Sequence, residues 1–289
     1  MKYFISYGDE KFSKSLKIAG LMAKFVGGFD KIKLYGPADL NSNFVKSNKE
    51  ILSIKRGAGL WLWKPYIIYE TLLNEINDGD LVFYSDAGSF FVRNVRHIEK
   101  VMKNSDIWVS DIPFQEVQFT KEDAFRILDI DDAVKDTAQI QASFLCIRKS
   151  KESVLFIKEW LDKCCDINLL HPDNLVGKDC SEKFISHRED QSILSLLCKK
   201  RKIKPHFDPS QYGKYPELYT RWNFERPIMD TVKEYPVCIV LHRNPNISFK
   251  SIVKQVLLAF IPAKIGISFL DLDVPEEKRQ AFMHRHNYK

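Results

Sequence analysis

The chain has 289 residues, of which 45% are hydrophobic and 28% charged, so it is long enough to bury a sizeable core, and a mainly disordered or collagen-like chain is excluded. Lys and Arg total 44 against 38 Asp and Glu, and the resulting net charge of +6 suits a polyanionic small ligand or an anionic membrane surface. The basic residues are too dispersed to indicate a nucleic-acid partner.

Apolar periodicity predicts strands that alternate with helices from residue 3 to about residue 245. We expect strands at residues 3–7, 31–35, 80–85, 106–110, 142–147, 203–207 and 236–241. We expect helices at residues 13–25, 44–54, 64–77, 94–102, 150–165 and 190–200, a helix pair or loop at 120–135, and a polar loop at 166–184. This alternation predicts an α/β fold with a mostly parallel sheet flanked by helices.

The C-terminal segment, residues 246–289, differs from the rest and predicts a separate tail after a domain at residues 1–245. Between Ser248 and Leu270 it carries Lys250, Lys254 and Lys264 among apolar residues and has no acid. Such a basic amphipathic stretch either docks on an anionic membrane or packs on the core with its lysines in solvent. We expect no transmembrane helix, because no apolar run reaches the roughly 18 residues that one requires.

The six cysteines form no C-x-x-C pair, and most lie in apolar runs where a free thiol acts as a small hydrophobe. This usage indicates a reducing compartment, so we expect a cytoplasmic protein. The phosphate-binding, dinucleotide, nucleophile-elbow and zinc-protease motifs are all absent from the sequence. Their absence disfavours P-loop kinases, dinucleotide oxidoreductases, serine hydrolases and zincins.

The strongest strand signal, at 80–85, leads into a short polar turn of Ser85, Asp86, Ala87 and Gly88. Ligands of open α/β sheets bind beyond the carboxyl ends of strands. A carboxylate there can hold a divalent metal against a diphosphate, and the small Ala87 and Gly88 let a phosphate approach. The alternative is a plain strand-end turn with Asp as its turn residue.

Two helix starts carry further polar signals. Trp63 and Lys64 begin one helix, where a lysine and the helix N-terminus together suit a pyrophosphate; the competing role for the Trp is core packing. Glu189, Asp190 and Gln191 open another helix, and this cluster exceeds what N-terminal capping needs. A carboxylate at that position can act as a general base on an incoming hydroxyl.

The strand at 236–241 ends on His242 and Arg243. The histidine is a candidate metal ligand and the arginine a candidate phosphate ligand. The alternative is an ordinary surface histidine. Each of these signals is weak alone, and their order along the chain is more informative than any one of them.

The phrases Trp61 to Tyr66, Tyr84 to Gly88 and Arg188 to Leu194, in this order, resemble bacterial capsular and O-antigen polysaccharide glycosyltransferases of the GT-A fold. The resemblance covers roughly residues 3–245. It implies a GT-A-like, Rossmann-type sheet and a nucleotide-sugar donor, with a UDP-hexose such as UDP-galactose expected. The implied acceptor is a hydroxyl of a growing surface polysaccharide or a lipid-linked oligosaccharide, reached from the inner face of the membrane.

The same resemblance implies roles for individual residues. Asp86 matches the family's D-x-D motif, which binds Mn²⁺ or Mg²⁺, but Gly88 replaces the second Asp; His242 matches a further metal ligand. Glu189 and Asp190 match the acceptor-binding acid and the base of inverting enzymes, whereas Asp190 with Gln191 also resembles retaining enzymes, so both outcomes stay open. The implied donor site comprises Ser6, Tyr7, Gly8, Trp63, Lys64, Ser85, Asp86, Ala87, Gly88 and Arg243.

Two other functions are compatible with these residues. A sugar-phosphate or nucleotidyl transferase on the same fold would use the same phosphate site and leave a phosphate in its product. A non-catalytic nucleotide-sugar-binding assembly subunit would explain the incomplete D-x-D motif at Gly88.

Overall fold

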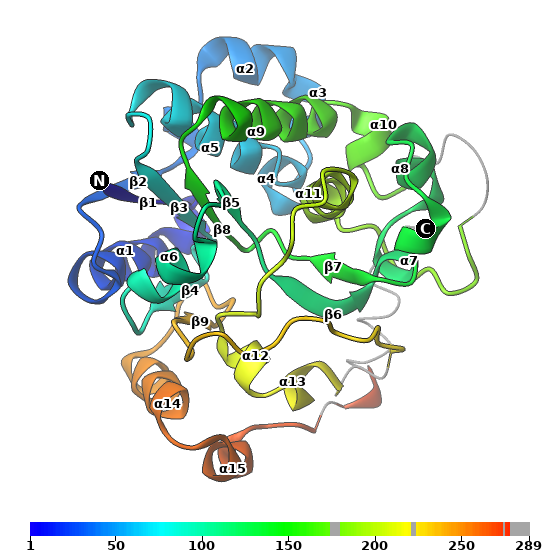
Figure 1. Cartoon of the computed structure of the whole chain (residues 1–289). Coiled ribbons are helices and arrows are strands. Elements are labelled where there is room, and N and C mark those ends of the chain that lie inside the picture. Colours follow the sequence, from blue (N-terminus) through cyan, green and yellow to red (C-terminus); the bar gives the residue numbers. More distant parts are fainter. Residues whose placement is uncertain (174–179, 221–223, 274, 278–289) are drawn as a thin grey trace.

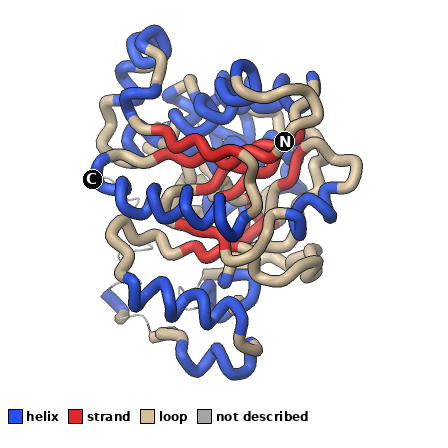
Figure 2. Tube along the Cα trace, turned by 90° about the vertical axis from the view of Figure 1, so that its left-hand side faces the viewer, coloured by secondary structure: helices blue, strands red, loops and turns tan. Residues whose placement is uncertain are grey.

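The computed structural model describes residues 1–173, 180–220, 224–273 and 275–277, and a five-stranded sheet lies at its centre (Figures 1 and 2). The strand order is β2 (Lys31–Tyr35), β1 (Lys2–Tyr7), β3 (Leu81–Ser85), β8 (Phe144–Arg148) and β5 (Ile107–Trp108). β1 pairs in parallel with β2 and β3, whereas β8 is antiparallel to both β3 and β5. The predicted α/β class with a mostly parallel sheet is therefore confirmed.

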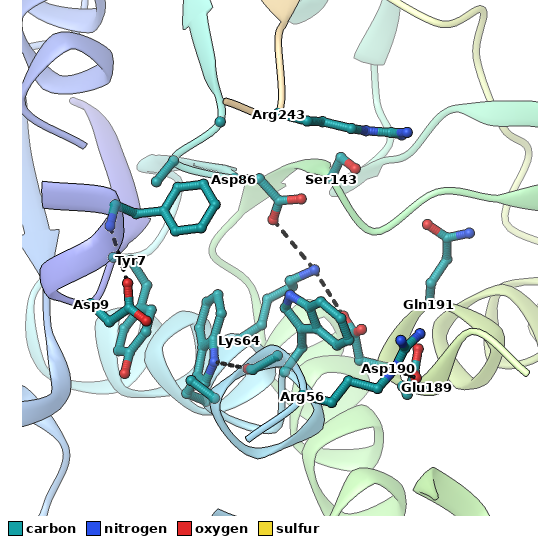
Figure 3. Close-up of a pocket in the computed structure, with 18 of the residues that line it drawn as sticks. Tyr7, Asp9, Arg56, Lys64, Asp86, Ser143, Glu189, Asp190, Gln191 and Arg243 are labelled. Carbon is teal, nitrogen blue, oxygen red and sulfur yellow. Dashed lines mark hydrogen bonds and ion pairs between the residues drawn. The ribbon is translucent and has the colours of Figure 1, made fainter. Parts of the chain in front are cut away.

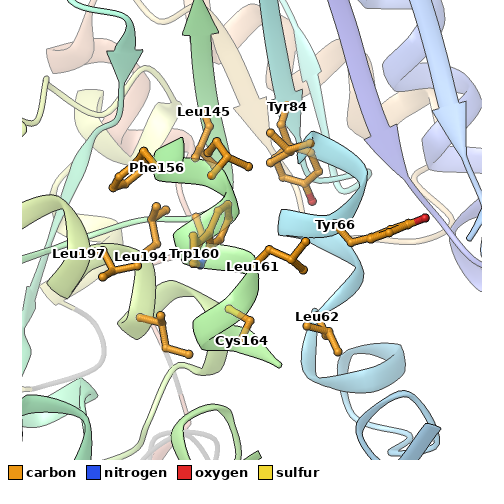
Figure 4. Packing of buried hydrophobic residues seen from close by; sticks show 14 of the residues in the cluster. Leu62, Tyr66, Tyr84, Leu145, Phe156, Trp160, Leu161, Cys164, Leu194 and Leu197 are labelled. Atoms are coloured by element: carbon orange, nitrogen blue, oxygen red, sulfur yellow. The ribbon is translucent and has the colours of Figure 1, made fainter. Parts of the chain in front are cut away.

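Helices cover both faces of this sheet (Figure 1). One face packs against α1 (Ser13–Met22) and α6 (Arg96–Met102), and the other against α5 (Trp63–Asn74), α9 (Lys151–Cys164) and α11 (Glu189–Lys200). Because successive strand side chains point to opposite faces, Phe83 joins the first layer and Tyr84 the second. Figure 4 shows Leu145 of β8 beside Phe156 and Trp160 of α9 in the second layer.

Two short antiparallel sheets lie beside the main one. β4 (Ser89–Phe91) pairs with β9 (Ile239–Leu241), and β6 (Asp111–Gln115) pairs with β7 (Ala138–Ile140). β4, β6 and β7 were not predicted. The β4–β9 pair brings two predicted site segments together, because the carbonyl of Gly88 accepts hydrogen bonds from the amides of His242 and Arg243 at 2.8 and 2.9 Å.

The remaining helices are short, apart from α14. They are α2 (Ser42–Ser47), α3 (Lys49–Leu52), α4 (Gly57–Leu60), α7 (Glu116–Phe119), α8 (Glu122–Ile127), α10 (Ile167–Leu170), α12 (Gln211–Lys214), α13 (Glu217–Thr220), α14 (Phe249–Phe260) and α15 (Ala263–Gly266). α10 lies in the segment 166–184 that was expected to be a polar loop, and residues 174–179 of that segment are outside the described residues.

The strand expected at 203–207 is wrong. Only His206 forms a bridge there, with Ser110. Pro205 has no amide hydrogen to donate, so the segment cannot continue a ladder.

The C-terminal part of the described chain packs against the body through α14. Leu258 and Ala259 of this helix are buried, and Lys214 donates through Nζ to the carbonyl oxygens of Leu258, Ala259 and Ile261 at its end. Of the expected tail, residues 274 and 278–289 lie outside the described residues, and the boundary at residue 245 stays a prediction. None of the described helices is long and apolar enough to cross a membrane.

Candidate functional site

A pocket of about 560 Å³ opens at the carboxyl ends of β1 and β3 (Figure 3). Tyr7 and Gly8 reach it from the end of β1, Asp86 from the end of β3, and Asp190 from the first turn of α11. Arg243 enters from the residues that follow β9. Strand ends and helix starts that are far apart in the sequence therefore supply one polar cavity, in the position where open α/β sheets bind ligands.

A buried lysine lies at the centre of the site. The Nζ atom of Lys64 is 2.9 Å from Oδ2 of Asp190 and 3.4 Å from Oδ1 of Asp86, and it donates to the carbonyl of Ala142 at 3.1 Å (Figure 3). Only 4% of the Lys64 side chain and 5% of the Asp190 side chain are exposed, against 30% for Asp86. Lys64 therefore joins two predicted site carboxylates, of which Asp86 has the greater access to the cavity.

Burial and this ion pair set the protonation states of Asp190 and Lys64. Burial raises the pKa of Asp190 to about 7, and the charge of Lys64 opposes that rise. Burial alone would lower the pKa of Lys64, but Asp190 and Asp86 outweigh it, so the pKa of Lys64 is raised. Lys64 is thus a permanent cation, whereas the Asp190 carboxyl can exchange a proton near neutral pH.

Asp86 is oriented by the strand that precedes it. The hydroxyl of Tyr84 donates to Oδ1 of Asp86 at 2.6 Å, and the Asp86 amide donates to the carbonyl of Ser143 at 3.0 Å. Burial, reinforced by the Asp86 charge, raises the pKa of Tyr84 well above its usual value, so this phenol stays a donor. One oxygen of Asp86 is therefore held by protein groups.

The start of α11 is held from two sides. Nε of Arg56 donates to Oε1 of Glu189, while Nε2 of Gln191 donates to Oε1 of Gln139 at 2.6 Å. Oε1 of Gln191 accepts from the Ala142 amide at 3.3 Å, which fixes the orientation of its carboxamide. The predicted Glu189, Asp190 and Gln191 all line the pocket.

Aromatic rings form the end of the pocket nearest β1. The rings of Tyr7 and Trp63 stack with their centroids 3.9 Å apart and an angle of 17° between them. Trp63 also donates through Nε1 to the Gly57 carbonyl at 2.9 Å. Burial, followed by the charge of Asp9, raises the pKa of Tyr7 to about 12. Trp63 thus serves both as a core residue and as a wall of the pocket.

Three predicted residues do not line the pocket. Ser6 is buried in β1, and Ser85 is buried with its hydroxyl against that of Ser89. His242 lies between two lining residues, but its ring packs 5.7 Å from that of Phe90, and its Nδ1 accepts from the Asn244 amide at 3.0 Å. Burial lowers the pKa of His242 to about 4, so this imidazole is neutral.

The residues at the D-x-D position do not fit a divalent metal. A Cβ atom on Gly88 would lie 2.9 Å from Cα of Arg243, so the backbone leaves no room for a second carboxylate. His242 does not line the pocket that contains Asp86. Within the described ranges, no group of three or more His, Cys, Asp and Glu side chains is placed to hold a metal ion.

Several lining residues were not predicted to act in the site. Lys11 and Lys55 are exposed at the pocket and form no ion pair among the described residues, and Asp9 and Phe12 lie beside Lys11. Position directly after the first parallel strand would have indicated the segment from Asp9 to Phe12. No local signal indicates Lys55, which lines the pocket from the loop before α4.

Strained backbone is concentrated in the pocket wall. Ala58, Trp61, Glu189 and Arg243 all line the pocket with positive φ angles of 50°, 59°, 42° and 54°. Such conformations cost on the order of 1–3 kcal/mol each for residues other than glycine. Their presence along one cavity indicates that the surrounding packing holds the wall in a defined shape.

No protein-family model and no curated protein matches the chain. Among solved structures, the chain is similar to mouse xyloside xylosyltransferase 1, with a TM-score of 0.46 and 11% identity over 86% of this chain and 100% of that one. It is similar to the galactosyltransferase LgtC, solved with donor and acceptor sugar analogs, with a TM-score of 0.49 and 14% identity over 96% of this chain and 99% of LgtC. It is also similar to the Streptococcus pneumoniae glycosyltransferase GlyE, with a TM-score of 0.44 and 10% identity over 93% of this chain and 62% of GlyE.

Proposed function

We propose that the protein is a glycosyltransferase that moves a hexose from a nucleotide-sugar donor, expected to be a UDP-hexose such as UDP-galactose, to an acceptor hydroxyl. One observation carries the proposal: the buried Lys64 joins Asp86 and Asp190 inside an open pocket at the strand ends. A volume of about 560 Å³ lies in the range of small-molecule sites.

The two ends of the pocket suit the two halves of such a donor. The stacked Tyr7 and Trp63 rings offer an aromatic wall to a nucleobase or ribose. Lys11, Lys55 and Arg243 supply positive charge for a diphosphate. The hexose would then lie toward Asp190, between the diphosphate and the acceptor.

The reaction forms a bond between the acceptor oxygen and C1 of the sugar and breaks the bond between C1 and the diphosphate oxygen. The nucleoside diphosphate leaves with the electron pair, and the sugar passes through an oxocarbenium-like state. Asp190 is the proposed base that takes the acceptor proton, because its pKa of about 7 suits proton transfer near neutral pH. Cations at the pocket stabilise the charge that develops on the leaving group.

The stereochemical outcome depends on which group faces the sugar. In an inverting reaction Asp190 acts directly as the base. In a retaining reaction Gln191, whose carboxamide is fixed by Gln139 and Ala142, faces the sugar beside Asp190. The anomeric configuration of the first product, read by NMR before it equilibrates, distinguishes the two.

A thermal-shift screen tests the donor site. The screen uses UDP, GDP, dTDP and CMP, each with and without Mn²⁺. A ligand at about 100 times its Kd stabilises the folded state by about 2.7 kcal/mol, which is readily seen. We expect one nucleotide to raise the melting temperature of the wild type. In the Asp86→Ala variant, the increase caused by the same nucleotide should differ from that in the wild type. Absence of any shift with all four nucleotides would contradict the donor site.

We further propose that the acceptor is a growing surface polysaccharide or a lipid-linked oligosaccharide, met at the inner face of a membrane. α14 supports this, because Phe249, Val253 and Leu257 lie one helical turn apart and are 80%, 41% and 58% exposed. Lys250 and Lys254 on the same helix would complement anionic lipids.

Cosedimentation with vesicles tests this membrane contact. The double variant Phe249→Ser/Leu257→Ser should bind vesicles that contain anionic lipid more weakly than the wild type does. Leu155→Ser, an exposed leucine on α9, is the matched control and should bind like the wild type. Equal binding by all three proteins, or no binding by the wild type, would contradict the contact.

A further inference from the structure

We propose that the site binds the donor diphosphate through fixed protein cations, chiefly Arg243, and requires no divalent metal to do so. This inference rests on the proposed function and specifies how the same site recognises its donor. It differs from the resemblance to known glycosyltransferases, which implied that Asp86 and His242 bind a divalent metal.

Backbone packing is the first observation. The Arg243 amide donates to the Gly88 carbonyl at 2.9 Å, and a Cβ on Gly88 would lie 2.9 Å from Cα and 3.2 Å from N of Arg243. Contacts under 3.0 Å to backbone require the main chain to move. The β4–β9 pairing therefore excludes a second carboxylate at this turn and brings an arginine there in its place.

The charge already present at Asp86 is the second observation. Its Oδ1 accepts from the Tyr84 hydroxyl at 2.6 Å and lies 3.4 Å from the Lys64 ammonium. A dication on this carboxylate would stand close to a buried ammonium, and repulsion between like charges at such distances is strong where little water screens it. Lys64 thus already supplies the positive charge that a metal would bring to Asp86.

The placement of Arg243 is the third observation. Its backbone has a φ of 54° and is tied to Gly88, and its side chain extends above Asp86 and Ser143 at the pocket (Figure 3). The guanidinium lies 5.4 Å from the Tyr212 ring, and it forms no ion pair with a carboxylate in the described ranges. A planar guanidinium donates two parallel hydrogen bonds to phosphate oxygens, which makes it a suitable diphosphate ligand.

Isothermal titration calorimetry with UDP, GDP, dTDP and uridine tests the inference. Wild-type protein is titrated once in EDTA and once with Mn²⁺. We expect at least one diphosphate to bind in EDTA with a Kd within about twofold of that in Mn²⁺. We expect Arg243→Gln to weaken the binding of that diphosphate by about tenfold or more, because a charge-assisted hydrogen bond is lost. The same variant should leave uridine binding unchanged.

Two further variants make the result specific. Arg96→Gln removes an exposed arginine of α6 away from the pocket and should bind like the wild type. Arg243→Lys keeps the positive charge but loses the planar guanidinium, so its affinity for the diphosphate should lie between those of the wild type and Arg243→Gln. Melting temperatures near that of the wild type would show that both Arg243 variants fold. Diphosphate binding only with Mn²⁺, or equal affinity of Arg243→Gln and wild type, would overturn the inference and leave the proposed function standing. Failure of every diphosphate in both conditions would overturn both.

Discussion

Replacement of Lys64 by Met tests the electrostatic centre of the site. Met keeps most of the side-chain volume and removes the charge, so Asp190 is left without a buried cation partner. Breaking a buried ion pair in this way costs about 3–5 kcal/mol in the free energy of unfolding. The cost depends on pH, because Asp190 in the variant can escape its burial penalty by taking up a proton.

Urea unfolding at pH 5 and pH 8 measures this effect. We expect Lys64→Met to lose more stability at pH 8 than at pH 5, because the Asp190 carboxyl is protonated at the lower pH. The double variant Lys64→Met/Asp190→Asn should recover part of the loss at pH 8, since it removes the unpaired charge. Lys17→Met, on the exposed face of α1, is the control and should change stability by less than about 0.5 kcal/mol.

A Lys64→Met variant that loses less than about 1 kcal/mol at both pH values would refute the proposed charge compensation by Lys64. A double variant that is no more stable than the single one at pH 8 would also contradict it. Either result would mean that Lys64 does not compensate the charge of Asp190 in the folded protein.

Three further predictions concern neighbouring residues. Burial raises the folded-state pKa of Asp190 to about 7, above its unfolded value, so this group makes stability fall as pH rises from about 4 to 7. Asp190→Asn should flatten that dependence of stability on pH in urea unfolding, and the same slope in both proteins would contradict the raised pKa. Tyr84→Phe removes a hydrogen bond to the neighbouring carboxylate and should lower kcat/KM of sugar transfer with a stability loss of about 0.5–1.5 kcal/mol; unchanged kcat/KM would count against that orienting role. Gly88→Ala should lose about 1–3 kcal/mol of stability by crowding the Arg243 backbone. Gly36→Ala, whose new Cβ would meet only ordinary contacts at 3.6 and 3.8 Å, should lose less in urea unfolding, and equal losses would refute the close approach.

Long apolar patterns made much of the central fold predictable from the sequence. β1, β3, α5, α9 and α11 each carry a contiguous signal, so their positions follow from local residues. The antiparallel direction of β8 does not, because it depends on how the chain returns across the sheet. The three-residue β4 exists only because it pairs with β9, about 150 residues later, and no local pattern reports such a partner.

The candidate site shows the same division. Asp86, Lys64 and the cluster at the start of α11 were predicted separately, from strand ends and helix starts. That Lys64 forms ion pairs with both Asp86 and Asp190 could not be predicted from the sequence, because it depends on the three-dimensional fold. The sequence also showed Gly88 in place of a second acid, but only the approach of the Arg243 backbone explains why no larger residue fits there.

Product analysis of nucleotide-sugar turnover tests glycosyl transfer most directly. The purified protein is incubated with UDP-hexoses and with GDP- and dTDP-hexoses, in EDTA and in Mn²⁺, together with simple glycoside acceptors, and the released nucleotide is identified by chromatography. We predict release of a nucleoside diphosphate in step with a new glycoside, and its loss in Asp190→Asn. Release of a nucleoside monophosphate would indicate sugar-phosphate transfer instead, and turnover that is unchanged in Asp190→Asn would contradict the role of this site.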